Sequence, residues 1–334
     1  MLKDIFKREN VIQSKDPLFV QGYLCMNYKM YDKRDFYHYT DINGFIGIIE
    51  NKEFWLSHIK YMNDSAEYVD GKNICEKVIK EMLATVTASE SEILTQLLAS
   101  INNEQSLGFF TMSGKDIFSL SFTKERDSLD MWRGYGNHSG IAIGFDYKKC
   151  DSTPGIGLIR KAEYDANVGN LNSSDPKILF LINIIYDDEI KKNIFRDIIN
   201  IGLEIFKTEN NQAIALEFLS GSLFRLFPFM KNKGFKNEQE CRIIDNEYSM
   251  LDESDPYEIS FRERNGIILP FTKYKIVDTN CKPISQWPIK EIIIGPGLRQ
   301  KDLAESVKYF LTVKGFPELA DKVIFSDIPY ISTM

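Results

Sequence analysis

The sequence of 334 residues has no closely spaced cysteine pair and only three histidines. Its cysteines are scattered, and they are Cys25, Cys75, Cys150, Cys241 and Cys281. No two of them have the spacing of a zinc-binding pair, and their odd number is typical of free thiols in a reducing compartment. We therefore expect a cytoplasmic protein without a disulfide framework. With so few histidines, we also expect no metal site.

The sequence also lacks an excess of basic over acidic residues, and it lacks a membrane-spanning segment. The formal net charge of −7 gives no general basic footprint for nucleic acid, although it leaves room for a local basic groove. No stretch approaches the ~20 consecutive apolar residues of a membrane span, and the first nine residues lack the apolar run of a signal peptide. The hydrophobic fraction of 43% and the charged fraction of 27% indicate a globular protein without a membrane partner.

The stretch 36–41 predicts a short strand that leads into a helix. Its aromatic residues favour a strand, and Thr40 or Asp41 can cap the helix, because a side-chain oxygen there accepts a hydrogen bond from a free backbone N–H. Apolar residues then recur at helical spacing over 42–49. His38 therefore lies near a strand-to-helix turn, where side chains often point into a cleft. The alternative is a histidine satisfied within the core.

Two later strands carry polar side chains on one face. Over 116–123, Ser119 and Ser121 alternate with large apolar residues. Small hydroxyl side chains on one face leave room for a ligand, and the alternative is an ordinary half-exposed strand. Over 238–244, Glu238, Glu240 and Arg242 share one face, and Cys241 and Ile243 face the core. A carboxylate beside a cation stays ionised and can stabilise an oxocarbenium-like sugar cation. The alternative here is a solvated strand face.

Short strands at irregular spacing, without regular βαβ alternation, predict a mixed α+β fold with a mainly antiparallel sheet. We expect an N-terminal extension over residues 1–35 and a single domain over 36–315. The apolar helical pattern at about 165–232 predicts a helical insertion in that domain. Residues 316–334 would form a tail packed on it.

The chain resembles a bacterial family known only as a domain of unknown function. The family motifs stand here as Tyr37–Thr40, Asn63-Asp64 with Glu67, Ser121–Thr123, Trp132 with Tyr135, Gly140–Phe145, and Glu238-Glu240-Arg242. This resemblance covers about residues 36–315 and does not by itself imply an activity.

The order of a histidine strand, a serine strand and a Glu-x-Glu strand is similar to the ADP-ribosyltransferase superfamily, in particular its bacterial toxins. That resemblance implies a split, mainly antiparallel sheet and NAD as a substrate. It implies that His38 holds the ribose of NAD and that Ser119 or Ser121 lies beside the nicotinamide. Glu240 would be the catalytic carboxylate, and Glu238 would orient the acceptor. His38, one of the two serines and Glu240 should then line one pocket.

The same resemblance extends the NAD site to Tyr39, Thr40 and Arg242. Trp132, Tyr135 or Tyr37 would stack on the nicotinamide or on a target base, and Tyr135 is an alternative to the serines in the middle role. Buried aromatic residues are more often simply part of the core.

These expectations describe an NAD-dependent ADP-ribosyltransferase that modifies a nucleic acid or a protein. Such a protein would be a bacterial toxin or phage-defence effector, with an antitoxin or defence-system partner. Two alternatives are an NAD glycohydrolase and a non-catalytic nucleotide-sensing module. A nuclease that binds Mg²⁺ or Mn²⁺ through Asp64, Glu67, His138 and Glu240 ranks last, because these residues have no recognisable metal spacing.

Overall fold

The structure, a computed structural model, describes residues 7–28, 30, 34–61, 67–102, 115–135, 140–146, 157–160, 181–249, 259–264, 266–277 and 287–329. Its strands are β1 (Phe36–Thr40), β2 (Glu53–His58), β3 (Lys115–Thr123), β4 (Ile141–Phe145), β5 (Gly157–Arg160), β6 (Ile182–Asn183), β7 (Glu240–Ser249), β8 (Ser260–Arg264), β9 (Ile267–Val277), β10 (Ile289–Ile294) and β11 (Val323–Phe325). Its α-helices are α2 (Arg8–Ser14), α3 (Pro17–Asn27), α4 (Ile42–Asn51), α5 (Glu67–Leu83), α6 (Ala88–Asn102), α8 (Leu129–Tyr135), α10 (Asp188–Glu209), α11 (Gln212–Leu226), α12 (Gln300–Val313) and α13 (Pro317–Ala320). Three 3₁₀ turns are η1 (Ile59–Tyr61), η2 (Phe227–Phe229) and η3 (Lys233–Glu238).

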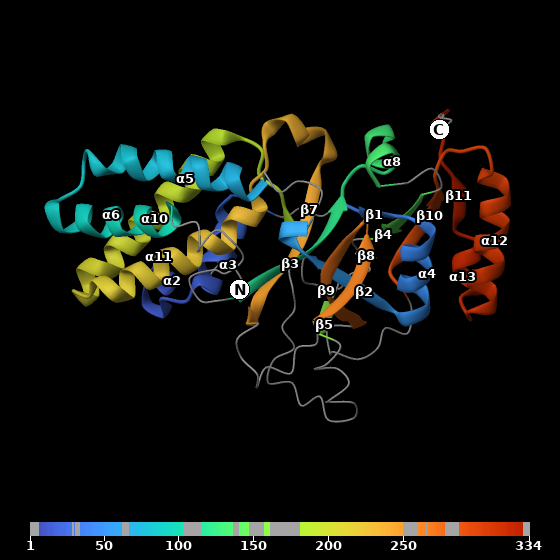
Figure 1. Ribbon diagram of the computed structural model, residues 1–334, viewed down its shortest axis with the longest axis horizontal. Helices are drawn as coiled ribbons and strands as arrows, with labels where there is room; N and C mark the ends of the chain where they lie inside the picture. Colours follow the sequence, from blue (N-terminus) through green and yellow to red (C-terminus); the bar gives the residue numbers. More distant parts are fainter. Residues whose placement is uncertain are drawn as a thin grey trace, which may run out of the picture.

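An 11-stranded sheet runs through the molecule in the order β11-β10-β4-β1-β3-β2-β9-β5 (Figure 1). In addition, β7 pairs with β3 and β6, and β8 pairs with β9. Among the strand pairs of the described residues, β10 and β11 alone run parallel. The predicted α+β class with a mainly antiparallel sheet is confirmed.

The sheet splits at β3. Strand β7 occupies one whole edge of β3, from Lys115 to Thr123. Strands β1 and β2 must therefore share the other edge, where β1 pairs at Thr123 and β2 pairs at Phe118 and Ser119. The two strands diverge between these points, and we call the gap between them the fork.

The junction of β1 and α4 forms as its local sequence predicts. Asp41 caps α4, because its Oδ1 accepts a hydrogen bond from the Gly44 backbone N–H at 2.7 Å. Phe45, Ile48 and Ile49 then face the core. This core also contains Phe118, Phe122, Cys241 and Ile243 and lies between the sheet and the helices α4, α12 and α13. We call this side of the sheet the α4 face.

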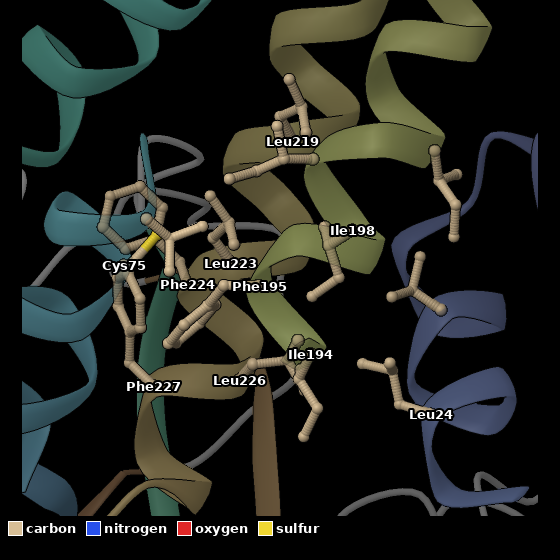
Figure 2. Packing of buried hydrophobic residues seen from close by; sticks show 14 of the residues in the cluster. Leu24, Cys75, Ile194, Phe195, Ile198, Leu219, Leu223, Phe224, Leu226 and Phe227 are labelled. Carbon is tan, nitrogen blue, oxygen red and sulfur yellow. The ribbon is translucent and has the colours of Figure 1, made fainter. Parts of the chain in front are cut away.

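A helical lobe lies at the other end of the molecule, at the left of Figure 1. Side chains of α3, α5, α10, α11 and η2 meet in its core, part of which Figure 2 shows. The predicted helical segment supplies α10 and α11, and its residues 165–180 lie outside the described part of the chain. The N-terminal helices join the lobe, because Arg8 binds Glu204 at 2.7 Å and Tyr28 binds Asp197 at 2.8 Å. The lobe therefore combines several segments rather than one insertion.

Residues 323–326 pack on the sheet. Strand β11 extends the sheet beside β10, and Ser326 donates a hydrogen bond to Asp127 at 2.7 Å, just before α8. Within the described ranges, no helix combines the length and apolarity needed to cross a lipid bilayer.

Candidate functional site

The Glu-x-Glu segment lies where β7 meets the helical lobe. Glu240 begins β7, but Glu238 ends the 3₁₀ turn η3, so the prediction that both lie on one strand face is wrong at Glu238. Gln239 between them has a φ of 40°, a left-handed conformation that interrupts the pleat. The carboxylates nevertheless share a cation: the Lys231 Nζ donates to Glu238 at 2.6 Å and to Glu240 at 3.1 Å.

Arg242 completes a buried ion network around Glu240. Its Nε and Nη2 donate to the two Glu240 carboxylate oxygens at 2.5 and 2.8 Å, and its Nη1 donates to the Pro228 carbonyl at 2.9 Å. Glu240, Arg242 and Lys231 are all buried, so the alternative of a solvated strand face is wrong. Burial opposes ionisation of Glu240, but the charges of Arg242 and Lys231 outweigh it and lower its pKa to about 2. Both carboxylate oxygens are thus engaged within the protein.

His38 lies at the fork and faces the α4 side of the sheet. Its ring centroid is 5.7 Å from that of Phe54 and 5.4 Å from that of Phe122, and both phenylalanines belong to the α4-face core. Its Nδ1 lies 3.0 Å from the Ser121 carbonyl oxygen, which accepts a hydrogen bond from it. Burial lowers the pKa of His38 to about 4, although the bond to Ser121 raises it. His38 is therefore neutral at pH 7.

The structure does not bring His38 and Glu240 to one face of the sheet. Glu240 is paired with Thr123, whereas His38 packs against Phe122, and successive residues of a strand point to opposite faces. Ser119 and Ser121 lie on the Glu240 side, and Ser121 helps to lower the Glu240 pKa. The pocket expected from His38, a serine and Glu240 is thus not formed by these three side chains.

The low pKa of His38 predicts a pH dependence of stability. Between pH 6.5 and 4 the unfolded chain binds a proton at this site that the folded chain does not, so stability falls as pH falls. We expect this term to lower the free energy of unfolding by at most about 2 kcal/mol from pH 7 to pH 5. Urea unfolding of the native protein and of His38→Asn at both pH values measures it. The variant should lose less stability than the native protein over this interval, and an equal loss in both would contradict the assignment.

The predicted aromatic residues gather apart from His38. Trp132 and Tyr135 of α8 belong to one cluster with Tyr39 of β1. The Trp132 indole N–H donates to Asp127 at 2.6 Å, and the Tyr39 hydroxyl donates to backbone carbonyls of the loop before α8. The ring centroids of Tyr39 and Trp132 lie 4.6 Å apart. They are packed against each other and hydrogen-bonded within the protein, as core aromatics are.

Other predicted residues are placed as follows. Thr40 packs on the first turn of α4, where its Oγ1 lies 2.1 Å from the position that a Cβ on Gly44 would take. Asp64 and His138 of the nuclease alternative lie outside the described residues, as does the side chain of Glu67. Among the side chains that the structure describes, no three metal-ligating residues come together.

A second polar group, which the sequence analysis missed, lies on the face of the sheet opposite α4. Arg262 of β8 donates to the Ser57 Oγ at 2.8 Å, and its guanidinium carbon lies 5.5 Å from the Trp55 ring and 5.3 Å from the Phe271 ring. Ser57 is paired with Ser119 on β3. We call Trp55, Ser57, Ser119, Arg262 and Phe271 the arginine cluster.

Three polar atoms of the arginine cluster are buried without a hydrogen-bond partner among the described residues. They are the Trp55 Nε1, the Ser119 Oγ and the Arg262 Nε. Burial and, to a smaller extent, the charge of the neighbouring Arg264 lower the pKa of Arg262 to about 10, although Asp41 opposes them. The alternation of Arg262 and Arg264 with other residues was the one sequence signal for a basic strand face here. The contact of Arg262 with Ser57, which lies 205 residues away in the sequence, had no local sequence signal.

Comparisons with known proteins give one match. No curated protein and no solved structure is significantly similar to the chain, and nothing links it to the ADP-ribosyltransferase superfamily. The matched segment begins within α8, continues through β4, α10 and α11 and ends in the first residues of β7, so it includes Trp132, Tyr135 and the Glu240 network. Residues 131–243 of the chain match the family described as a protein of unknown function, DUF2971.

Proposed function

We propose that this protein binds a phosphate-bearing nucleotide at the arginine cluster and does not use Glu240 as a catalytic group. The observation that carries the proposal is the set of three buried polar atoms without partners, on Trp55, Ser119 and Arg262. Each such group costs roughly 1–3 kcal/mol when it is left unpaired. A ligand that accepts from the guanidinium and the indole and bonds to the hydroxyl would offset this cost.

The chemistry of the arginine cluster favours an anionic ligand. A guanidinium offers donors in a planar fork that matches a phosphate, and Arg264 adds a second positive charge nearby. The two flanking rings, Trp55 and Phe271, are stacked at 4.5 Å and give an apolar wall beside the guanidinium. NAD is the first nucleotide to test, because the resemblance to ADP-ribosyltransferases implies it.

A ligand can reach these buried atoms if β8 moves. Among the described strands β8 pairs with β9 alone, so its displacement breaks no other strand pairing. The contact of Arg262 with Ser57 would then be exchanged for a contact with the ligand.

The transferase expectation has less support from the geometry. Glu240 accepts three hydrogen bonds from Arg242 and Lys231, which leaves its oxygens little capacity for a ribose hydroxyl. An NAD-dependent transferase or glycohydrolase that uses Glu240 is therefore the competing proposal, and one assay separates the two.

Calorimetric titration with NAD, ATP, ADP-ribose and the phosphate-free nucleoside adenosine tests the proposal. We expect the phosphorylated ligands to bind and adenosine to bind at least tenfold more weakly. Arg262→Met keeps the apolar stem and removes the charge-assisted bonds, which are worth about 1.5–3 kcal/mol, so it should weaken binding roughly 10- to 100-fold. Arg299→Met is the matched control, because Arg299 is exposed and remote in sequence from the cluster.

Two results would contradict the proposal. Equal affinity of the Arg262→Met and native proteins would exclude the arginine cluster as the binding site. Release of nicotinamide from NAD by the native protein, lost in a folded Glu240→Gln variant, would instead support the transferase or glycohydrolase.

A further inference from the structure

Lys273 of β9 lies beside the arginine cluster on the same face of the sheet. Lys273 is paired with Trp55 across β9 and β2, and Phe271 is paired with Ser57. Directly paired residues, and residues two apart on one strand, point to the same face. The face that carries Arg262 therefore holds a second cation.

The ring of Phe271 brings the two cations into one group. The Lys273 Nζ lies 5.8 Å from the centroid of this ring, and the Arg262 guanidinium carbon lies 5.3 Å from the same centroid. The Trp55 ring stacks on the Phe271 ring, with 4.5 Å between the centroids. Because both cations lie near one ring, a single anionic chain can reach both of them.

Neither cation is neutralised by an ion pair in the part of the chain that the structure describes. Lys275, two residues further along β9, binds Glu53 at 2.8 Å. Lys273, by contrast, forms no ion pair with a described residue. Glu263 follows Arg262 on β8 but points to the opposite face, because successive residues of a strand alternate.

The charges that act on Arg262 do not cancel. After burial, Arg264 has the larger influence on the pKa of Arg262 and lowers it, and the smaller influence of Asp41 raises it. The Asp41 carboxylate is also engaged as the cap of α4, where it accepts from the Gly44 backbone N–H at 2.7 Å. Among the described residues, the surroundings of Arg262 and Lys273 thus keep an excess of positive charge.

The two cations belong to different strands, and this decides how a ligand can reach both. Arg262 lies on β8, whereas Lys273 lies on β9 beyond Phe271, the last β9 residue that pairs with β8. The displacement of β8 considered above therefore moves Arg262 and leaves Lys273 beside Trp55. A ligand bound first at Lys273 would meet Arg262 when β8 returns.

We infer that the ligand of the arginine cluster carries a diphosphate or a longer phosphate chain, and that Lys273 binds its second phosphoryl group. This inference rests on the nucleotide binding proposed above. A single phosphate at Arg262 would leave Lys273 without an anionic partner, whereas two linked phosphates give each cation one. The planar fork of arginine suits one phosphate, and the ammonium of lysine binds the next as a point charge.

Calorimetric titration with AMP, ADP and ATP in the presence of EDTA tests the inference, because no metal then neutralises the phosphates. We expect the native protein to bind ADP and ATP at least about tenfold more tightly than AMP. Lys273→Met should weaken the binding of ADP and ATP roughly tenfold or more and change that of AMP by less than about twofold. Lys273→Arg keeps the charge and should retain the preference for ADP over AMP.

Two further variants separate a contact at Lys273 from a general effect of charge. Lys308→Met makes the same substitution at an exposed lysine of α12, and it should bind all three nucleotides like the native protein. Arg262→Met should weaken the binding of all three, because the first phosphate contacts Arg262. Thermal unfolding checks that each variant is folded.

The outcomes distinguish the inference from the proposed function. Equal affinity of the native protein for AMP and ADP, or an equal loss of both in Lys273→Met, overturns the inference and leaves nucleotide binding intact. Absence of binding by all three nucleotides contradicts the proposed function. Inorganic pyrophosphate and phosphate then test the inference without a nucleoside: tighter binding of pyrophosphate, lost in Lys273→Met, supports it, and equal binding of the two overturns it.

Discussion

Glu240→Gln should lower the free energy of unfolding by roughly 3–5 kcal/mol. Removal of one partner from a buried ion pair leaves the other charge buried without compensation. Here the buried Arg242 would lose the charge of Glu240, and the buried Lys231 would keep only that of Glu238 in this network. Urea unfolding followed by circular dichroism measures the change, and we expect the midpoint to fall with little change in the slope.

Two comparisons make this prediction specific to the network. Glu263→Gln changes an exposed glutamate of β8 and should alter stability by less than about 1 kcal/mol. Arg242→Met should destabilise as Glu240→Gln does, and the two effects should not add, because both break the same pair. A Glu240→Gln protein with native stability would mean that the network does not hold β7 to the helical lobe.

Gly202→Ala should destabilise the helical lobe by about 1–3 kcal/mol. Gly202 lies on α10 where α11 approaches, and a Cβ there would lie 2.4 Å from the Leu219 Cγ. The Cγ is close to the α11 backbone, so a rotation of the Leu219 side chain cannot fully relieve the contact. Thermal or urea unfolding measures the loss.

Gly47→Ala provides the opposite result from the same chemical change. Gly47 lies within α4, and a Cβ there would meet no atom within 4 Å. Alanine stabilises a helix by roughly 0.5–1 kcal/mol relative to glycine, so this variant should be more stable than the native protein. Destabilisation by both changes, or by neither, would contradict the close approach of α10 and α11.

The fold was predictable where neighbouring residues decide the structure. Alternation over 116–123 predicted β3, and Phe118 and Phe122 lie in the core. The predicted burial of Cys241 beneath Glu240 is also confirmed. These predictions hold because the pleat of a strand fixes which neighbours share a face.

The site was less predictable because its residues are brought together over long sequence distances. Nothing near Arg262 in the sequence indicates Ser57 as its partner. Nothing near Lys231 indicates that it is buried between Glu238 and Glu240. Long polar side chains are usually exposed, so their burial here depends on the packing of the helical lobe against β7.

The sequence alone determined the strand-to-helix junction at Asp41, the alternation of β3 and the α+β class, because each depends on residues close together in the chain. The tertiary structure decided that β1 and β2 share one edge of β3, and it placed His38 and Glu240 on opposite faces. Each strand has two faces, and local periodicity identifies residues on the same face without relating the faces of distant strands. Only the register between β1, β3 and β7 fixes that relation.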